Sequence, residues 1–185
     1  MARAHGHAEM TDPGQELVDV VDEDDRVVAT VTRREIRARH LLHRCTYVLL
    51  RNASGQILVH RRTDTKDVYP GAYDVFAGGV CAAGESYDDC AGREVAEEFG
   101  VVGANLRFLF KHRYQGTHGQ AWGAVYEARW DGPVRPQESE VAWHAWVAPE
   151  QLDRMLGELP FCLDSREIFE RVSQLAPPRN QPSIQ

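Results

Sequence analysis

The chain has 185 residues, which is enough for one well-buried domain but cramped for two. Its hydrophobic content of 43% is ordinary for a globular protein, and its formal net charge of −7 argues against a general nucleic-acid coat, because phosphate backbones require a basic surface. No apolar run reaches the roughly 18 residues of a membrane span. We therefore expect neither a nucleic-acid polymer nor a membrane as partner, whereas a small phosphorylated ligand needs only a local basic patch.

Both ends of the chain are polar. Residues 1–14 lack the apolar segment of a secretory signal, and residues 177–185 are rich in proline. We expect flexible tails at 1–14 and 177–185 around a single domain at 15–176. The four cysteines show neither a CxxC pair nor zinc-ligand spacing, so we expect reduced, structural thiols in a cytoplasmic protein.

Short β segments are predicted in the first part of the chain. Residues 16–32 contain two of them around an acidic turn at 22–25, and a second hairpin-like pair, 45–50 and 56–61, is joined at 52–55. A further strand over 73–79 ends in glycines.

The next segment predicts a helix. Ser86 is a candidate N-cap with Asp89 three residues on, and Gly100 stands at the usual C-terminal position. An apolar stripe suited to packing on a sheet runs along this helix: Tyr87, Cys90, Ala91, Val95 and Phe99.

Strands at 106–114, 121–130 and 140–147 follow, and helices at 149–156 and 163–175 close the domain. The order is strands, one central helix, more strands and then helices. It predicts an α/β fold, an α/β/α sandwich around a mixed β-sheet, rather than a doubly wound Rossmann fold.

The central helix carries three glutamates within five residues, Glu94, Glu97 and Glu98. Like charges at helical spacing repel by a few tenths of a kcal/mol per pair, so either a cation offsets them or the face is simply solvated. The three lie within an arc of about 100° on a face other than the apolar stripe. Mg²⁺ prefers such oxygen ligands and commonly combines one or two carboxylates with substrate phosphates. Arg93, one turn before Glu97, is placed to orient it.

The full pattern resembles the signature of the Nudix hydrolase family, GX5EX7REUXEEXGU, in which U is aliphatic. It runs from Gly79 through Glu85 to the stretch REVAEEFGV at 93–101, without a departure. The resemblance implies the Nudix fold. It also implies hydrolysis of a diphosphate bridge linked to another moiety, with Mg²⁺ or Mn²⁺ and water.

The resemblance also implies roles for individual positions. Glu140 is the candidate for a base or extra ligand from a later loop, with Glu138 behind it; the alternatives are a base among the helix glutamates and an ordinary exposed charge at Glu140. The metal ligands it implies are Glu94, Glu97, Glu98 and the carbonyl of Gly79, with Arg93 and Glu85 as supports.

A stretch upstream is similar to type I isopentenyl-diphosphate isomerases, an offshoot of the same family. Its R-R-x-x-x-K pattern, at Arg61, Arg62 and Lys66, implies cations for a diphosphate, and we favour Arg62 and Lys66 because strand neighbours face opposite sides. His43 falls where those isomerases bind a metal, although a lone histidine is more often structural. The isomerisation itself is not supported, since Gly78 replaces the reactive cysteine and cannot move a proton. We place the chain in an isomerase-like subgroup of Nudix hydrolases.

We therefore predict a Mg²⁺-dependent hydrolase that acts on a small-molecule diphosphate, a nucleoside di- or triphosphate or a related derivative. Two alternatives stay open, an isopentenyl-diphosphate-isomerase-like enzyme and a catalytically inert nucleotide-binding module. The first hairpin could pair across a homodimer. Six aromatic residues are candidates for contacting the organic group, with core packing as the alternative: Tyr69, Tyr73, Phe76, Tyr114, Trp122 and Trp143.

Overall fold

The computed structural model describes residues 12–175. The tails predicted at 1–14 and 177–185 lie outside this range, apart from residues 12–14, where a short 3-10 turn begins. The described elements are η1 (Pro13–Gln15), β1 (Leu17–Val21), β2 (Val27–Thr32), α1 (Arg33–Arg39), β3 (His43–Arg51), β4 (Ile57–Arg62), β5 (Tyr73–Asp74), β6 (Phe76–Ala77), α2 (Tyr87–Phe99), β7 (Leu106–Gly116), β8 (Gly119–Arg129), β9 (Val141–Val147), α3 (Pro149–Glu158) and α4 (Leu163–Leu175).

A mixed sheet with β3 at its centre forms the middle of the molecule. β3 pairs in parallel with β8 along its whole length, and β8 pairs antiparallel with β7. β3 also pairs antiparallel with β6 and, at single positions, with β1 and β4. β1 and β2 form the antiparallel hairpin expected for residues 16–32.

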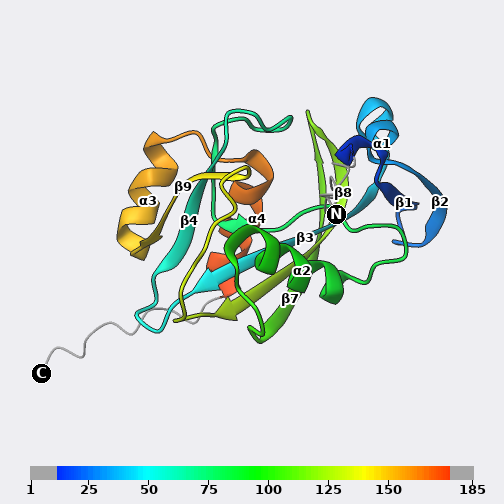
Figure 1. Cartoon of the computed structure of the whole chain (residues 1–185). Coiled ribbons are helices and arrows are strands. Elements are labelled where there is room, and N and C mark those ends of the chain that lie inside the picture. The colour runs from blue at the N-terminus through cyan, green and yellow to red at the C-terminus, as the bar shows by residue number, and fades with distance from the viewer. Residues whose placement is uncertain (1–11, 176–185) are drawn as a thin grey trace, which may run out of the picture.

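Alternating side chains of β3 supply core residues to both faces of the sheet. Leu49 belongs to the apolar cluster in which Leu152 of α3 and Ile168 of α4 are buried. Val48 and Leu50 belong to the opposite cluster, on which α2 packs. In Figure 1, α2 and α4 accordingly lie on opposite sides of β3. The predicted α/β/α sandwich with a mixed sheet is the observed fold.

The second hairpin-like pair is confirmed at its turn, where the antiparallel strands β3 and β4 are joined through residues 52–55. β3 and β4 pair only at Arg51 and Ile57, next to the turn, and then diverge. β4 pairs instead with β9, while β3 takes β8 as its parallel neighbour. The residues of β3 and β4 are mostly apolar, and such a pattern does not specify which distant strand each of them pairs with.

The strand predicted over 73–79 is interrupted at Val75. The side chain of Asp74 accepts a hydrogen bond from the backbone N–H of Phe76 at 2.9 Å. This local hydrogen bond competes with the regular hydrogen bonds between strands. As a result, β5 pairs with β4 and β6 pairs with β3.

Sequence analysis did not predict α1. The hydroxyl of Thr32 caps this helix by accepting a hydrogen bond from the N–H of Glu35 at 3.3 Å, and His40, with φ 49°, ends it. Ile36 is its one buried residue, so the sequence has no apolar stripe that would predict this helix.

The cap residues predicted for α2 are confirmed. Ser86 Oγ accepts a hydrogen bond from the N–H of Asp89 at 3.1 Å, and Gly100 adopts the left-handed conformation with φ 66°. All four cysteines are free and buried. Within residues 12–175, no helix combines the length and apolar character that crossing a membrane requires.

His60 of β4 makes stability depend on pH. Its ring packs edge-to-face on Phe99 at 5.2 Å between centroids, and burial, with the charges of Arg62 and Lys66, lowers the pKa of His60 from 6.5 to about 3. Between pH 6.5 and 3, His60 is therefore protonated in the unfolded chain and neutral in the folded chain. The contribution of His60 is fully present above pH 6.5 and is lost as the pH falls toward 3.

We expect the free energy of unfolding to fall, relative to that of His60→Phe, by up to about 1.4 kcal/mol per pH unit between pH 6.5 and 3. Denaturant unfolding of both proteins across this range measures the difference. The comparison isolates His60, because a buried carboxyl such as Asp74, whose pKa burial raises, changes stability in the opposite direction in both proteins. Parallel profiles would contradict the expectation.

Candidate active site

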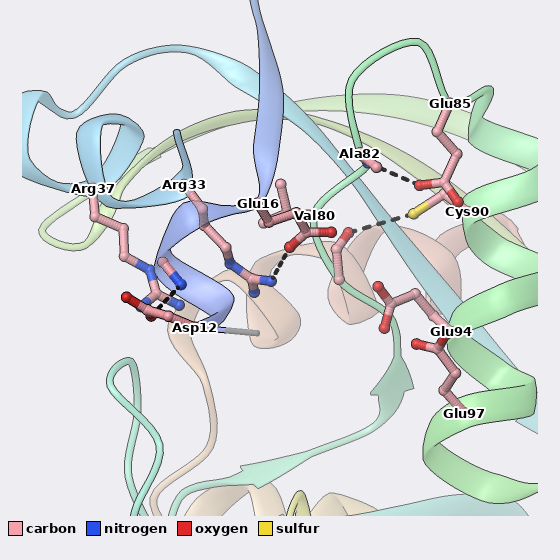
Figure 2. A network of polar contacts seen from close by, with 12 residues as sticks. Asp12, Glu16, Arg33, Arg37, Val80, Ala82, Glu85, Cys90, Glu94 and Glu97 are labelled. Atoms are coloured by element: carbon pink, nitrogen blue, oxygen red, sulfur yellow. Dashed lines mark hydrogen bonds and ion pairs between the residues drawn. The ribbon is translucent and has the colours of Figure 1, made fainter. Parts of the chain in front are cut away.

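A cavity of about 400 Å³ lies beside α2 and is also lined by α1, the loop after β4, the tip of the β7–β8 hairpin and the start of α4. Its volume is within the usual range for small-molecule sites. Figure 2 shows Glu94 and Glu97 on α2 facing Arg33 and Arg37 of α1 across the open space.

The acidic side of the cavity depends on a glycine next to α2. Glu94, Glu97 and Glu98, here called the acidic wall, all line the cavity. A Cβ on Gly79 would lie 2.6 Å from the carboxyl carbon of Glu94, so the absence of a side chain lets this carboxylate approach the backbone. The carbonyl of Gly79 accepts a hydrogen bond from the N–H of Thr46 at 2.9 Å and a longer one from the thiol of Cys90 at 3.9 Å, so a cation would have to displace the thiol to use this oxygen.

Glu98 is the most deeply buried member of the acidic wall. It is 8% exposed, and its Oε2 accepts a hydrogen bond from the backbone N–H of Gly78 at 3.2 Å. Burial, reinforced by the negative charge of Glu94, raises the pKa of Glu98 to about 8, and burial also raises the pKa of Glu94. A cation bound between the two carboxylates would stabilise both charged forms.

Arg93 holds the carboxylates around it. Its Nε and Nη2 donate to the two oxygens of Glu85 at 2.8 and 2.9 Å, and its Nη1 donates to Glu94 at 2.9 Å and Glu97 at 3.1 Å. Glu85 also accepts a hydrogen bond from the N–H of Ala82 at 2.9 Å. The bonds with Arg93 lower the pKa of Glu85, which stays charged and anchors the guanidinium.

The acidic wall has the donors that a hard divalent cation requires. Carboxylate and carbonyl oxygens suit Mg²⁺ or Mn²⁺, and Glu94, Glu97, Glu98 and Gly79 all line the cavity. Among the described residues, three ligand atoms lie within 4.8 Å of one another only at Cys81, Glu85 and Cys90. The glutamate oxygens would therefore have to draw together around a cation. The buried thiols offer soft donors that Mg²⁺ does not favour.

Two of the three predicted phosphate-binding cations line the cavity. Arg62 donates from Nε and Nη2 to the carbonyl of Val68, at 3.3 and 3.1 Å, and so lies along the loop. Burial and the nearby Arg62 lower the pKa of Lys66 to about 8, so an adjacent anion favours its charged form. Arg61 pairs with Asp64 at 2.6 Å and does not line the cavity.

His43 and Glu140 also line the cavity, whereas Glu138 is exposed and does not. His43 Nδ1 donates to the carbonyl of Leu41 at 2.9 Å, and burial lowers the pKa of His43, so its Nε2 is an acceptor. The carboxylate of Glu140 forms an ion pair with the ammonium of Lys66.

Two further cations of the cavity, Arg33 and Arg37 of α1, were not predicted from the sequence. Arg33 Nη1 pairs with Glu16 at 3.0 Å, and Arg37 pairs with Asp67. We call Arg33, Arg37, Arg62 and Lys66 the basic wall. The run RREIRAR was the available signal, but it does not show that α1 lies opposite α2.

The structure also separates the six aromatic candidates. Tyr69, Phe76 and Tyr114 line the cavity, and Tyr47 and His118, which were not predicted, join them. The remaining candidates do not line it: Tyr73, Trp122 and Trp143.

Comparison with known proteins gives the family. Residues 41–172 match the NUDIX domain. The chain is 48% identical over 159 residues to an uncharacterized Nudix hydrolase of Streptomyces coelicolor, covering 85% of this chain and 88% of the relative. It is 41% identical over 150 residues to an uncharacterized Nudix hydrolase of Pseudomonas aeruginosa, covering 81% and 89%. The chain belongs to the Nudix hydrolase family.

Solved structures agree with this assignment. A crystal structure of a Deinococcus radiodurans protein has a TM-score of 0.75 at 30% identity, covering 84% of this chain and 98% of that one. The NUDIX domain of Shewanella oneidensis NrtR, complexed with ADP ribose, has a TM-score of 0.59 at 20% identity, covering 73% and 87%, and shows a likeness of fold.

Replacing Arg93 should destabilise the protein in a pH-dependent way. We expect Arg93→Gln to lower the free energy of unfolding by about 1–3 kcal/mol at pH 7, less than for a fully buried pair because the Arg93 side chain is 32% exposed. Glu85 has a lowered pKa, so its contribution is present above its ordinary value of 4.5 and is lost as the pH falls through the lowered value.

The loss caused by Arg93→Gln should therefore shrink below pH 4.5, as measured by denaturant unfolding. The control is Arg26→Gln, which removes an exposed pair with Asp24 and should change stability by less than about 0.5 kcal/mol. Equal losses in the two variants would show that Arg93 does not hold the acidic wall together.

Proposed function

We propose that the protein is a divalent-metal-dependent hydrolase of a diphosphate linkage in a nucleoside di- or triphosphate or a related nucleoside diphosphate derivative. The observation that carries this proposal is that the acidic wall and the basic wall line one cavity, with Glu94 and Glu97 across from Arg33 and Arg37 in Figure 2. An acidic wall by itself repels phosphate, and a basic wall by itself repels a metal ion. Together they suit a cation and a phosphorylated ligand bound side by side.

The basic wall supplies the contacts for phosphate oxygens. Guanidinium groups present several N–H donors in a fixed fork, and an ammonium adds a compact charge. Arg62 donates from two nitrogens to a carbonyl, and Arg33 and Arg37 each pair with one carboxylate. Donors therefore remain on all three guanidinium groups for the negatively charged part of a substrate.

The acidic wall and the carbonyl of Gly79 would hold Mg²⁺ or Mn²⁺. Such an ion, when bound, neutralises charge on phosphate oxygens and lowers the pKa of a water molecule. Arg93 keeps Glu94 and Glu97 in position, and Glu98 is held by the N–H of Gly78. The ADP ribose bound by the NrtR domain, a diphosphate derivative of a nucleoside, is compatible with this substrate class.

A carboxylate of the site accepts the proton of the attacking water. Glu97 and Glu98, both on the acidic wall, are candidates for this base. Glu140 is the alternative base, although its ion pair with Lys66 favours the unprotonated form.

The isomerase alternative has no support at Gly78. A Cβ at this position would lie 2.8 Å from the carbonyl carbon of Thr46, and φ is 155°, so the backbone leaves no place for a cysteine. Membership of the isomerase-like subgroup, the homodimer and the cytoplasmic location stay predictions. A nucleotide-binding module without chemistry is an outcome of the first experiment below.

The first experiment measures phosphate and pyrophosphate release from nucleoside di- and triphosphates, sugar nucleotides, dinucleotides and prenyl diphosphates, with Mg²⁺ and with EDTA. We expect turnover of nucleoside substrates that EDTA abolishes and that Glu98→Gln lowers at least about a hundredfold, because one electrostatic group commonly contributes that much. Turnover unaffected by either change would refute the metal site. Binding of Mg²⁺ without any turnover would indicate the module without chemistry.

A matched pair of glycine substitutions tests the close approach of Glu94. Gly79→Ala should displace the flexible end of Glu94, leave the fold intact and lower turnover about tenfold or more. Gly92→Ala, in α2, meets no atom within 4 Å and should stabilise the helix by about 0.5–1 kcal/mol with normal turnover. Turnover assays and thermal unfolding measure both effects, and normal turnover in Gly79→Ala would remove the need for this contact.

A further inference from the structure

A second group of cavity residues is aromatic and hydrogen-bonding rather than ionic in character. It comes from β3, the loop before β5, the β7–β8 hairpin and the start of α4. We call it the aromatic subsite; its members are Tyr47, Tyr69, Tyr114, His118 and Asp164. None of these residues has a part in the hydrolysis described above.

Tyr69 is held in the cavity by a strained backbone. Its φ is 51°, a left-handed conformation that a bulky residue rarely adopts. Its hydroxyl lies 3.2 Å from that of Tyr114, and its ring meets that of His118 edge-to-face at 4.6 Å between centroids. Strain of this kind persists where surrounding contacts fix it, and it is concentrated at ligand sites.

Asp164 has an unused acceptor in the same group. Its Oδ2 accepts a hydrogen bond from the hydroxyl of Tyr47 at 2.8 Å. Its Oδ1 is buried and, within residues 12–175, has no hydrogen-bond partner. A buried polar oxygen without a partner is costly, so a ligand that donates an N–H to it gains more than one that does not.

We propose that the aromatic subsite binds the base of a nucleotide and that Asp164 selects bases that carry an exocyclic amino group. The inference rests on the proposed function and specifies the organic part of its substrate. An amino group donates a hydrogen bond to the free oxygen of Asp164. A ring carbonyl at the same place would bring its oxygen against that of Asp164, and two acceptors form no hydrogen bond. The flat base stacks on the tyrosine ring, an interaction that all bases share.

Pairs of nucleotides that exchange an exocyclic amino group for an oxo group, and the adjacent ring nitrogen acceptor for an N–H donor, test this selection. The probes are the α,β-methylene analogues of adenosine and inosine diphosphate and of cytidine and uridine diphosphate, whose P–C–P bridge is not hydrolysed. Calorimetry with Mg²⁺ gives the ratio of dissociation constants within each pair. We expect the native protein to favour the amino member of at least one pair about tenfold, the size of effect that one buried hydrogen bond gives.

Asp164→Asn should bring this ratio close to one, because its side-chain amide offers a donor as well as an acceptor. The control is Glu170→Gln, an exposed acidic residue of the same helix that does not line the cavity, and it should keep the ratio. A ratio of one in the native protein for both pairs, or an unchanged ratio in Asp164→Asn, would overturn the proposal.

Further variants separate recognition from folding. Tyr69→Leu should weaken both members of a pair about tenfold and keep the ratio, whereas Tyr69→Phe should bind almost as the native protein does. Tyr47→Phe frees the second oxygen of Asp164 and should keep or raise the preference for the amino base, even if Asp164→Asn fails to fold. Loss of the preference in Tyr47→Phe would count against Asp164 as the acceptor.

The outcome is distinguishable from that of the hydrolase proposal. Selective binding of the methylene analogues without turnover of any natural diphosphate would keep the inference and refute the hydrolysis. Turnover without selectivity between amino and oxo bases would keep the hydrolysis and refute the inference.

Discussion

The site depends on carboxylates buried close to one another on one helix. Burial and the charge of Glu94 raise the pKa of Glu98, so the fully charged wall is unfavourable unless positive charge lies beside it. Arg93 supplies part of that charge and is itself anchored by Glu85. Like charges destabilise an exposed helix only weakly. Once the helix packs on a sheet, their repulsion increases, because the surroundings screen charge less, and a nearby cation then stabilises them strongly.

Close packing between the loop before α2 and its neighbours brings the backbone against these carboxylates. At Gly78 the backbone lies against Thr46 of β3, and at Gly79 it lies against the carboxylate of Glu94. Helix, loop and central strand are therefore closely packed on one another, whereas the residues opposite come from α1, the loop after β4 and the start of α4. Such an arrangement places the carboxylates on closely packed elements and leaves contacts with the rest of a substrate to these other segments.

Much of the fold was predictable, because local patterns carried it. The cap at Ser86, the left-handed Gly100 and the apolar stripe defined α2, and the order of elements gave the layers. The predicted β3–β4 hairpin is confined to its turn, and β4 pairs mainly with β9, because apolar runs do not specify a distant partner. α1 was missed because one buried residue, Ile36, makes no periodic signal.

The sequence by itself determined the acidic wall, since helical spacing places Glu94, Glu97 and Glu98 on one face whatever surrounds them. It also determined the glycine that lets Glu94 approach the backbone, through the family signature. Tertiary structure decided what faces the wall. α1 and the aromatic subsite reach the cavity through strand pairings such as β1 with β3 and β8 with β3, which join residues far apart in the chain. Local sequence cannot encode such contacts, because their partners are chosen by packing of the whole sheet.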